Sequence, residues 1–279
     1  MIERNYSDPV KKLLQLGMPE VDEWPDYLAM GVTPEHIPEL IELVGDEELR
    51  WVDDLGEDED QPQWYAQIHA WRSLGQLKAE PAIPALIGIL HQADDYDDEW
   101  AGEELMGVFT LIGPAAIGPL EAYLADPGNK PYARGIACES LKDMAEAYPE
   151  KRAACVTGLA AALQLYERND KTLNAFIIID LVDLKAVEHL GLIEAAFEND
   201  RVEMMVGGDF EDVQIELGLL EERKTPSPRD LYFEGLMKRY EQELIRSERS
   251  RSREAEKKAK AKRKQEKQSR RANRKRKKK

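Results

Sequence analysis

Acidic side chains gather in two short segments of this 279-residue sequence. Closely spaced carboxylates can bind a cation, act as a general acid and base, or attract a basic partner. The two segments, together called the acidic ridge here, contain Asp53, Asp54, Glu57, Asp58, Glu59 and Asp60, followed by Asp94, Asp95, Asp97, Asp98 and Glu99. The second segment lacks the central glycine and the 12-residue layout of an EF-hand loop, so a specific calcium site is not expected.

The acidic ridge is extended by carboxylates at equivalent places further along the chain. These residues are Asp126, Glu167, Asp170, Glu198 and Asp200. If the segments between them form a regular stack, the acidic loops lie along one edge of it. We interpret this edge either as a surface that binds a basic partner protein or as a solvated surface that keeps the protein soluble.

Other residue types give no indication of a catalytic or metal site. The four histidines are separated from one another, with no pair four residues apart and no cysteine at ligand spacing, and no phosphate-binding glycine loop is present. Paired carboxylates occur again at Asp209, Glu211, Asp212 and Glu216. We interpret these as the solvated face of a helix that turns Val213 and Leu217 inward. No catalytic residue, cofactor or metal ion is therefore predicted.

The two cysteines and the apolar runs indicate the compartment. Cys138 and Cys155 are interpreted as reduced residues of the core. The segment MIERNYSDPVKK has alternating charge and no apolar core of a secretory signal, and the longest mostly apolar run, Ala153–Leu163, is short for a membrane span. We expect a cytoplasmic protein, or a nuclear one if the source is a eukaryote.

An eight-residue pattern that must form helices recurs along the chain. It reads IPELIELV from Ile37, IPALIGIL from Ile83, IGPLEAYL from Ile117, VTGLAAAL from Val156 and LGLIEAAF from Leu190. Positions 1, 4 and 8 are apolar in every copy, a spacing that places them on one stripe of an α-helix. Such a period along the sequence is typical of a repeated supersecondary unit.

A second pattern precedes the first one in each unit. A small residue followed by Ser or Thr and then Leu occurs in the segments Ala70–Leu74, Gly107–Leu111 and Ala137–Leu141, with Asp180-Leu181 as a weaker fourth copy. A break marked by Pro81, Pro114 or Pro149 follows three of these copies. Because proline is tolerated in the first turn of a helix but not inside it, these prolines mark the start of the second helix. The unit is therefore predicted to be two helices joined by a short turn.

These residues resemble HEAT repeats, specifically the HEAT-like repeats named after phycocyanobilin lyases. Asp126-Pro127 followed by Tyr132-Ala-Arg134 is similar to the Asp-turn-Arg feature of such repeats, and the resemblance covers roughly residues 37–222. It implies an all-α protein, an α-solenoid of about five stacked helix pairs. The chain also resembles bacterial HEAT-like proteins of unknown function, some of which end in a cysteine-rich zinc motif. No cysteine follows Cys155, so that zinc motif is not carried over.

Composition and turn signals divide the chain into three parts. Residues 1–225 form the acidic solenoid, in which Thr33-Pro34-Glu35 is a helix start. Residues 226–245 form a proline-marked linker and an amphipathic helix, with Ser227 as its cap and Pro228 in its first turn. The apolar face of this helix consists of Leu231, Tyr232, Leu236, Tyr240 and Leu244. We expect it to cap the stack, with exchange onto a partner as the alternative.

The third part, residues 246–279, is strongly basic. It holds 19 Lys and Arg against four Glu, a net of +15, whereas the whole chain is −16, so residues 1–245 carry −16 − 15 = −31. With no apolar residue beyond alanine, this tail is expected to be disordered or a solvated helix. Its densest cations, interpreted as nucleic-acid contacts, are Arg270, Arg271, Arg274, Lys275, Arg276, Lys277, Lys278 and Lys279. The alternatives are contact with its own acidic body, an anionic membrane surface, or a nuclear-localisation signal.

These features favour a non-catalytic scaffold. Its acidic repeat surface would bind a partner protein, and its basic tail would contact RNA or the ribosome. One alternative, implied only by the resemblance, is an accessory enzyme of the lyase type that handles a tetrapyrrole on a partner protein. Another is a self-masked binding module whose tail docks on its body. Aromatic side chains at Trp64, Trp71 and Trp100 are attributed to core packing, because an acidic body repels phosphate.

Overall fold

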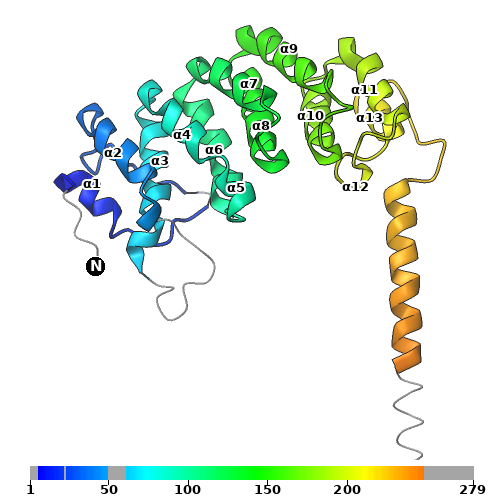
Figure 1. Cartoon of the computed structure of the whole chain (residues 1–279), viewed down its shortest axis with the longest axis horizontal. Helices are drawn as coiled ribbons and strands as arrows, with labels where there is room; N and C mark the ends of the chain where they lie inside the picture. The colour runs from blue at the N-terminus through cyan, green and yellow to red at the C-terminus, as the bar shows by residue number, and fades with distance from the viewer. Residues whose placement is uncertain (1–5, 22, 50–60, 248–279) are drawn as a thin grey trace, which may run out of the picture. The chain divides into compact units, whose positions relative to one another are not determined.

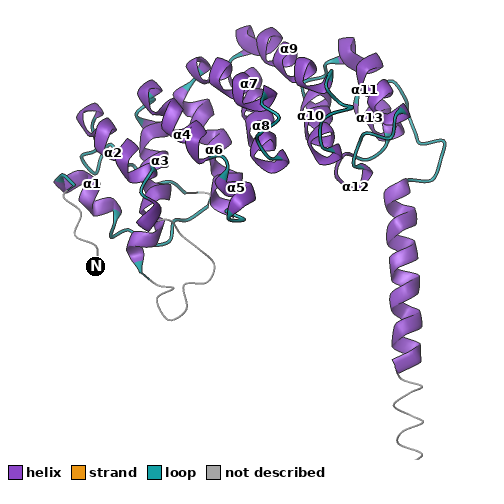
Figure 2. Ribbon diagram, viewed as in Figure 1, coloured by secondary structure: helices purple, strands orange, loops and turns teal. Residues whose placement is uncertain are grey.

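The chain is helical wherever the structure describes it. The computed structural model describes residues 6–21, 23–49 and 61–247, and all regular elements in these ranges are α-helices or 3₁₀ turns (Figure 2). This confirms the all-α class predicted from the sequence. The chain divides into two compact units, Met1–Lys224 (unit 1) and Thr225–Lys279 (unit 2).

Unit 1 is built from two layers of helices (Figure 1). The first layer contains α3 (Ala66–Gln76), α6 (Glu99–Ile112), α8 (Pro131–Ala147) and α10 (Lys171–Asp183), each packed against the next. The second layer contains α2 (Ile37–Val44), α4 (Ile83–Ile89), α7 (Ile117–Ala125), α9 (Arg152–Leu163) and α11 (Leu190–Glu198). Shorter helices complete the unit: α1 (Asp8–Leu13), α5 (Gln92–Asp95), α12 (Met204–Gly207) and α13 (Phe210–Glu216). Because the chain crosses between the layers at each step, consecutive helix pairs stack side by side.

The repeat pattern of the sequence corresponds to the second layer. Helices α2, α4, α7 and α11 begin at the first residue of the eight-residue pattern, and α9 begins earlier, at Arg152, and ends with the pattern at Leu163. The three predicted breaks are 3₁₀ turns, Glu80–Ala82, Pro114–Ala116 and Pro149–Lys151. Each turn leads directly into its second-layer helix, as the position of the proline predicts.

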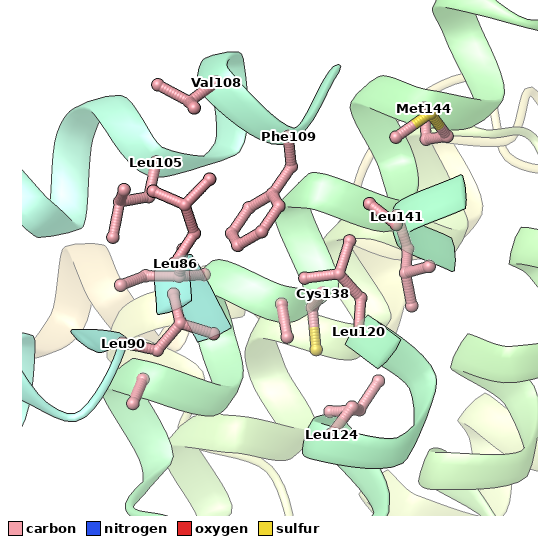
Figure 3. Close-up of a cluster of buried hydrophobic side chains, with 14 of the residues drawn as sticks. Leu86, Leu90, Leu105, Val108, Phe109, Leu120, Leu124, Cys138, Leu141 and Met144 are labelled. Atoms are coloured by element: carbon pink, nitrogen blue, oxygen red, sulfur yellow. The ribbon is translucent and has the colours of Figure 1, made fainter. Parts of the chain in front are cut away.

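The core lies between the two layers. The fourth position of the pattern is fully buried in every copy, at Leu40, Leu86, Leu120, Leu159 and Ile193. Figure 3 shows one part of this core, where leucines of α7 and α8 surround Cys138. Cys138 and Cys155 are both free and buried, as predicted. Trp71 is 1% exposed, which confirms its place in the core.

Neighbouring helices of the first layer approach one another closely at small residues. A Cβ atom built on Gly135 of α8 would lie 2.8 Å from the Phe176 ring of α10, and one on Gly75 of α3 would lie 3.3 Å from Leu111 of α6. Real Cβ atoms essentially never lie this close to a neighbouring atom, so a larger residue at position 135 would force the Phe176 ring to shift.

A buried ion pair joins α3 to α6. The Arg72 guanidinium donates two hydrogen bonds to the Glu104 carboxylate, one of them from Nε at 2.8 Å, and Trp71 Nε1 donates a third at 3.0 Å. The same guanidinium donates to the Glu20 carbonyl at 2.9 Å and lies 4.9 Å from the centre of the Trp24 ring. The pair thus links two neighbouring repeats. Because both charges are buried, loss of either partner leaves the other as an unpaired buried charge.

In unit 2 the described residues include a helix over residues 228–247. Ser227 Oγ accepts a hydrogen bond from Asp230 N at 3.3 Å, which confirms the predicted cap. The predicted apolar face is exposed, with Leu231, Tyr232, Leu236, Tyr240 and Leu244 between 44% and 64% accessible to solvent. The capping role assigned to this helix stays a prediction.

Among the residues that the structure describes, no single helix is long and apolar enough to cross a bilayer. One pair of helical segments, Glu99–Ile112 and Pro114–Ala125, is long and apolar enough when the two are taken together, but the pair is bent by 114°.

Replacing Glu104 by Gln should destabilise unit 1 by about 3–5 kcal/mol, because the Arg72 charge then stays buried without a counter-charge. Urea denaturation followed by circular dichroism measures this loss. The neighbouring Glu103→Gln, at an exposed position of the same helix, is the matched control and should change stability by less than about 0.5 kcal/mol. Equal effects of the two substitutions would show that the ion pair does not hold the repeats together.

Candidate functional site

A pocket of about 450 Å³ lies across the first layer, on α6, α8 and α10. Its volume falls in the range of small-ligand and side-chain pockets. The residues that line it recur at intervals of three or four along the three helices, so they occupy one face of each helix. They are Glu99, Gly102 and Glu103 of α6, Tyr132, Gly135, Ile136, Glu139 and Lys142 of α8, and Phe176, Ile179, Asp180 and Asp183 of α10, with Ala93, Asp97 and Asp98 just before α6.

The pocket is strongly acidic. Seven of its side chains carry a carboxyl group and one carries an amino group. The carboxyl groups belong to Asp97, Asp98, Glu99, Glu103, Glu139, Asp180 and Asp183, and the amino group belongs to Lys142. In a concave site with low-dielectric walls, such an excess of one sign concentrates the field and favours a cationic ligand.

Asp180 is the most deeply placed of these carboxyl groups. Its residue is 5% exposed, and no hydrogen bond reaches its carboxylate from any residue that the structure describes. Burial raises the pKa of Asp180 well above its ordinary value, and the Glu139 carboxylate raises it further, whereas Lys142 opposes the rise. Asp183 and Asp143 add smaller contributions in the same direction as Glu139.

Lys142 does not neutralise Asp180 by direct contact. Its Nζ atom lies 3.1 Å from Asp143 and 3.6 Å from Glu139, and no ion pair joins it to Asp180. Burial alone would lower the pKa of Lys142, but the bond to Asp143 and the nearby carboxylates raise it above its ordinary value. Lys142 therefore stays positively charged and interacts electrostatically with Asp143, Glu139 and Asp180.

The wall of the pocket includes two aromatic rings. Tyr132 and Phe176 have ring centres 5.8 Å apart and ring planes inclined by 57°. Tyr132 is 58% exposed. The Phe176 ring rests on the backbone of α8 at Gly135, so its position follows from the missing Cβ of that glycine.

Asp180 departs from the repeat at a position where the other copies carry a hydroxyl. Ser73, Thr110 and Ser140 each donate a hydrogen bond to the carbonyl four residues earlier, at 2.6, 2.9 and 2.6 Å. The Asp180 side chain makes no such bond in the structure. This departure from the repeat was visible in the sequence, where Asp180-Leu181 is the weaker fourth copy of the pattern, but it did not identify the pocket.

The structure places the second segment of the acidic ridge beside the pocket. Asp97, Asp98 and Glu99 line it. Asp94 instead accepts hydrogen bonds from the amides of Tyr132 and Ala133, at 3.3 and 2.6 Å, at the start of α8. Asp95 pairs with Lys130 at 2.5 Å, and this bond lowers the pKa of Asp95.

Other predicted residues lie outside the described part of the chain. These are Asp53, Asp54, Glu57, Asp58, Glu59 and Asp60 of the acidic ridge, and Arg270, Arg271, Arg274, Lys275, Arg276, Lys277, Lys278 and Lys279 of the tail.

Several acidic loop residues cap helices, a role that charge counting did not reveal. Asp98 accepts from Ala101 N at the start of α6, and Asp170 accepts from Thr172 N at the start of α10. Glu203 caps α12 in the same way, with Met205 N as donor. A carboxylate at this place satisfies a free amide and complements the positive end of the helix dipole. Part of the acidity of these loops is therefore structural.

The remaining acidic segment also forms a cap. Asp209 and Asp212 form a reciprocal capping box at the start of α13, and Arg223 pairs with both. Val213 is buried and Leu217 packs against the core, as predicted. Asp126 accepts from Gly128 N, whereas Arg134 donates to the Leu124 carbonyl and to Asn169.

Metal binding has no support from the described residues. Among them, no three His, Cys, Asp or Glu side chains are grouped closely enough to hold an ion. The carboxylates of the pocket are instead spread over three helices.

Comparison with known families gives one match. Residues 29–236, which are 236 − 29 + 1 = 208 of the 279 residues, match a family model described as Protein of unknown function (DUF1186), and the chain belongs to this family. No curated protein and no solved structure matches the chain.

The variant Asp180→Asn should gain stability relative to the wild type as the pH rises. The pKa of Asp180 is higher in the folded state than in the unfolded chain, so its contribution to stability is present at low pH and is lost as the pH rises through the folded-state pKa. Asparagine does not ionise and escapes this loss. Thermal melts of both proteins across a pH series measure the difference. The control Ile179→Val, on the same helix, should give a difference from wild type that does not vary with pH, and a flat profile for Asp180→Asn would contradict the expectation.

Proposed function

We propose that this DUF1186 protein is a non-catalytic scaffold that binds a basic segment of a partner protein at the pocket of the first layer. On this proposal the Lys/Arg-rich residues 246–279 contact RNA or the ribosome. The observation that carries the proposal is the excess of carboxyl groups over amino groups in the pocket, seven against one.

Charge complementarity supports a basic partner. Residues 1–245 carry a net charge of −31, and the pocket adds a local concentration of the same sign on one face of the repeats. Such a field speeds the encounter with a cationic segment and suppresses the binding of anionic ones.

The architecture supports binding rather than chemistry. Stacked helix pairs offer an extended face in which equivalent positions of successive repeats lie side by side, and solenoids use such faces to bind other macromolecules. The pocket takes residues from three successive first-layer helices, as expected for such a face. The HEAT-like resemblance of the repeat pattern is consistent with this use, since repeats of this class indicate a fold and a surface rather than a reaction.

The basic tail extends the proposal to nucleic acid. Lys and Arg without apolar residues neutralise phosphates and read no bases, so the expected contact is independent of sequence. Because the rest of the chain repels phosphate, this contact is confined to the tail.

Neutralising two exposed carboxylates of the pocket should weaken binding of a basic peptide. In the full-length chain, the double variant Glu103→Gln, Asp183→Asn should bind a fluorescein-labelled Lys/Arg-rich peptide about threefold to tenfold more weakly than the wild type. Fluorescence anisotropy at physiological salt measures the affinity.

The matched control removes the same amount of charge elsewhere. Glu150 and Glu194 are exposed and lie outside the pocket, so Glu150→Gln, Glu194→Gln should change the affinity by less than about twofold. Equal losses in the two double variants would mean that only net charge matters. Absence of peptide binding by the wild type would refute the proposed function.

Single-stranded RNA should bind the full-length chain with an affinity that falls as salt rises. The logarithm of the binding constant is expected to fall by about 0.7 per phosphate neutralised for each unit of log salt concentration. Replacing Arg270, Arg271 and the cations of residues 274–279 by Gln should reduce this slope. A slope that is unchanged in the Gln variant would locate the RNA contact outside these residues.

A further inference from the structure

The burial of Asp180 is not explained by attraction of a basic segment alone. Exposed carboxylates such as Glu103 and Asp183 already supply the long-range field. A buried carboxyl group without a hydrogen-bond partner is costly to the fold. A cation that enters the pocket lined by Asp180 would satisfy this group, because its charge favours the ionised carboxylate that burial disfavours.

The protein itself offers no such group among the described residues. Lys142, the one amino group of the pocket lining, pairs with Asp143 and Glu139. The hydroxyl side chains that occupy the equivalent repeat position donate to their own helix, whereas the Asp180 side chain makes no such bond. The carboxylate thus has free acceptor capacity in a cavity of about 450 Å³.

The aromatic wall specifies the shape of the cation. A planar guanidinium can stack on an aromatic ring while it donates two parallel hydrogen bonds to a carboxylate. Phe176 lies one helical turn before Asp180 on α10, and the Tyr132 ring of α8 lies beside the Phe176 ring. Side chains four residues apart in a helix lie on the same face, so the Phe176 ring and the Asp180 carboxylate line the same part of the pocket.

We propose that the pocket takes the side chain of an arginine from the partner's basic segment, with the guanidinium paired to Asp180 and in contact with the rings of Phe176 and Tyr132. This inference rests on the proposed function and adds the residue type that the pocket recognises. Arginine is favoured over lysine because its guanidinium is planar, carries a matching pair of donors and is less strongly hydrated than an ammonium group. The rim carboxylates then contact the flanking cations of the same segment.

The first test uses single amino acids as probes. Titration of N-acetylarginine amide into the full-length chain should shift the methyl signals of Ile136 and Ile179, which line the pocket, in ¹³C-methyl NMR spectra. N-acetyllysine amide should bind roughly fivefold more weakly, because it cannot stack or donate in parallel.

Two replacements at Asp180 separate binding from folding. Asp180→Asn removes the charge with little change in shape, and Asp180→Ser restores the hydroxyl that the other repeats carry. Both should keep the methyl spectrum of the folded chain and lower the arginine affinity about tenfold or more. The control Glu194→Gln, at an exposed position outside the pocket, should cost less than about twofold. Phe176→Leu should reduce the preference for arginine over lysine.

The outcomes distinguish this inference from the proposed function. Equal affinities for arginine and lysine, or an unchanged arginine affinity in both Asp180 variants, would overturn the inference. If the Lys/Arg-rich peptide still binds and still depends on Glu103 and Asp183, the proposed function stands without it. If free N-acetylarginine amide binds more tightly than the peptide, the pocket takes a small guanidinium compound and the assignment to a partner's side chain is wrong.

Discussion

The close lateral packing of the first-layer helices is the constraint on which the rest of unit 1 depends. Helices can approach this closely only where side chains are small, as at Gly75 and Gly135, and only where the buried polar groups between them are paired. The Arg72–Glu104 pair meets the second condition between α3 and α6. Between α8 and the segment just before α10, Arg134 donates a charge-assisted hydrogen bond to the side-chain oxygen of Asn169. The apolar stripe drives the stacking, and these polar contacts fix its register.

The same packing explains why the loops are acidic and why the pocket forms where it does. Free amides at the starts of α6, α8 and α10 are satisfied by the carboxylates of Asp98, Asp94 and Asp170. Capping therefore places negative charge at the N-terminal ends of these helices, where it stabilises the fold. Asp180 has no such role. Its position inside α10 makes ionisation costly to the fold, so a stabilising replacement that weakens ligand binding would be the expected sign of a functional residue.

The fold was predictable from the sequence because its signals are local. The apolar spacing and the prolines at the breaks depend only on neighbours within a few residues, and they placed the second-layer helices and the 3₁₀ turns correctly. The pocket was not predictable, because Tyr132, Phe176 and Asp180 come together only through the stacking of α8 on α10. The acidic segment at Asp94 was identified, but whether each carboxylate caps a helix or faces the pocket depends on the tertiary packing.

The charge split limits how the two proposed contacts can coexist. Unit 1 repels phosphate, so a partner that binds its pocket must carry the opposite sign, and such a partner is itself attracted to nucleic acid. An arginine cannot be paired with a phosphate and with Asp180 at the same time. The pocket and nucleic acid therefore compete for the same cations on the partner, while the basic tail competes with that partner for phosphate. Rising salt weakens the phosphate contacts of partner and tail alike, whereas a desolvated pair at Asp180 is screened much less. The balance between the free and the nucleic-acid-bound partner is then set by ionic strength as well as by concentration.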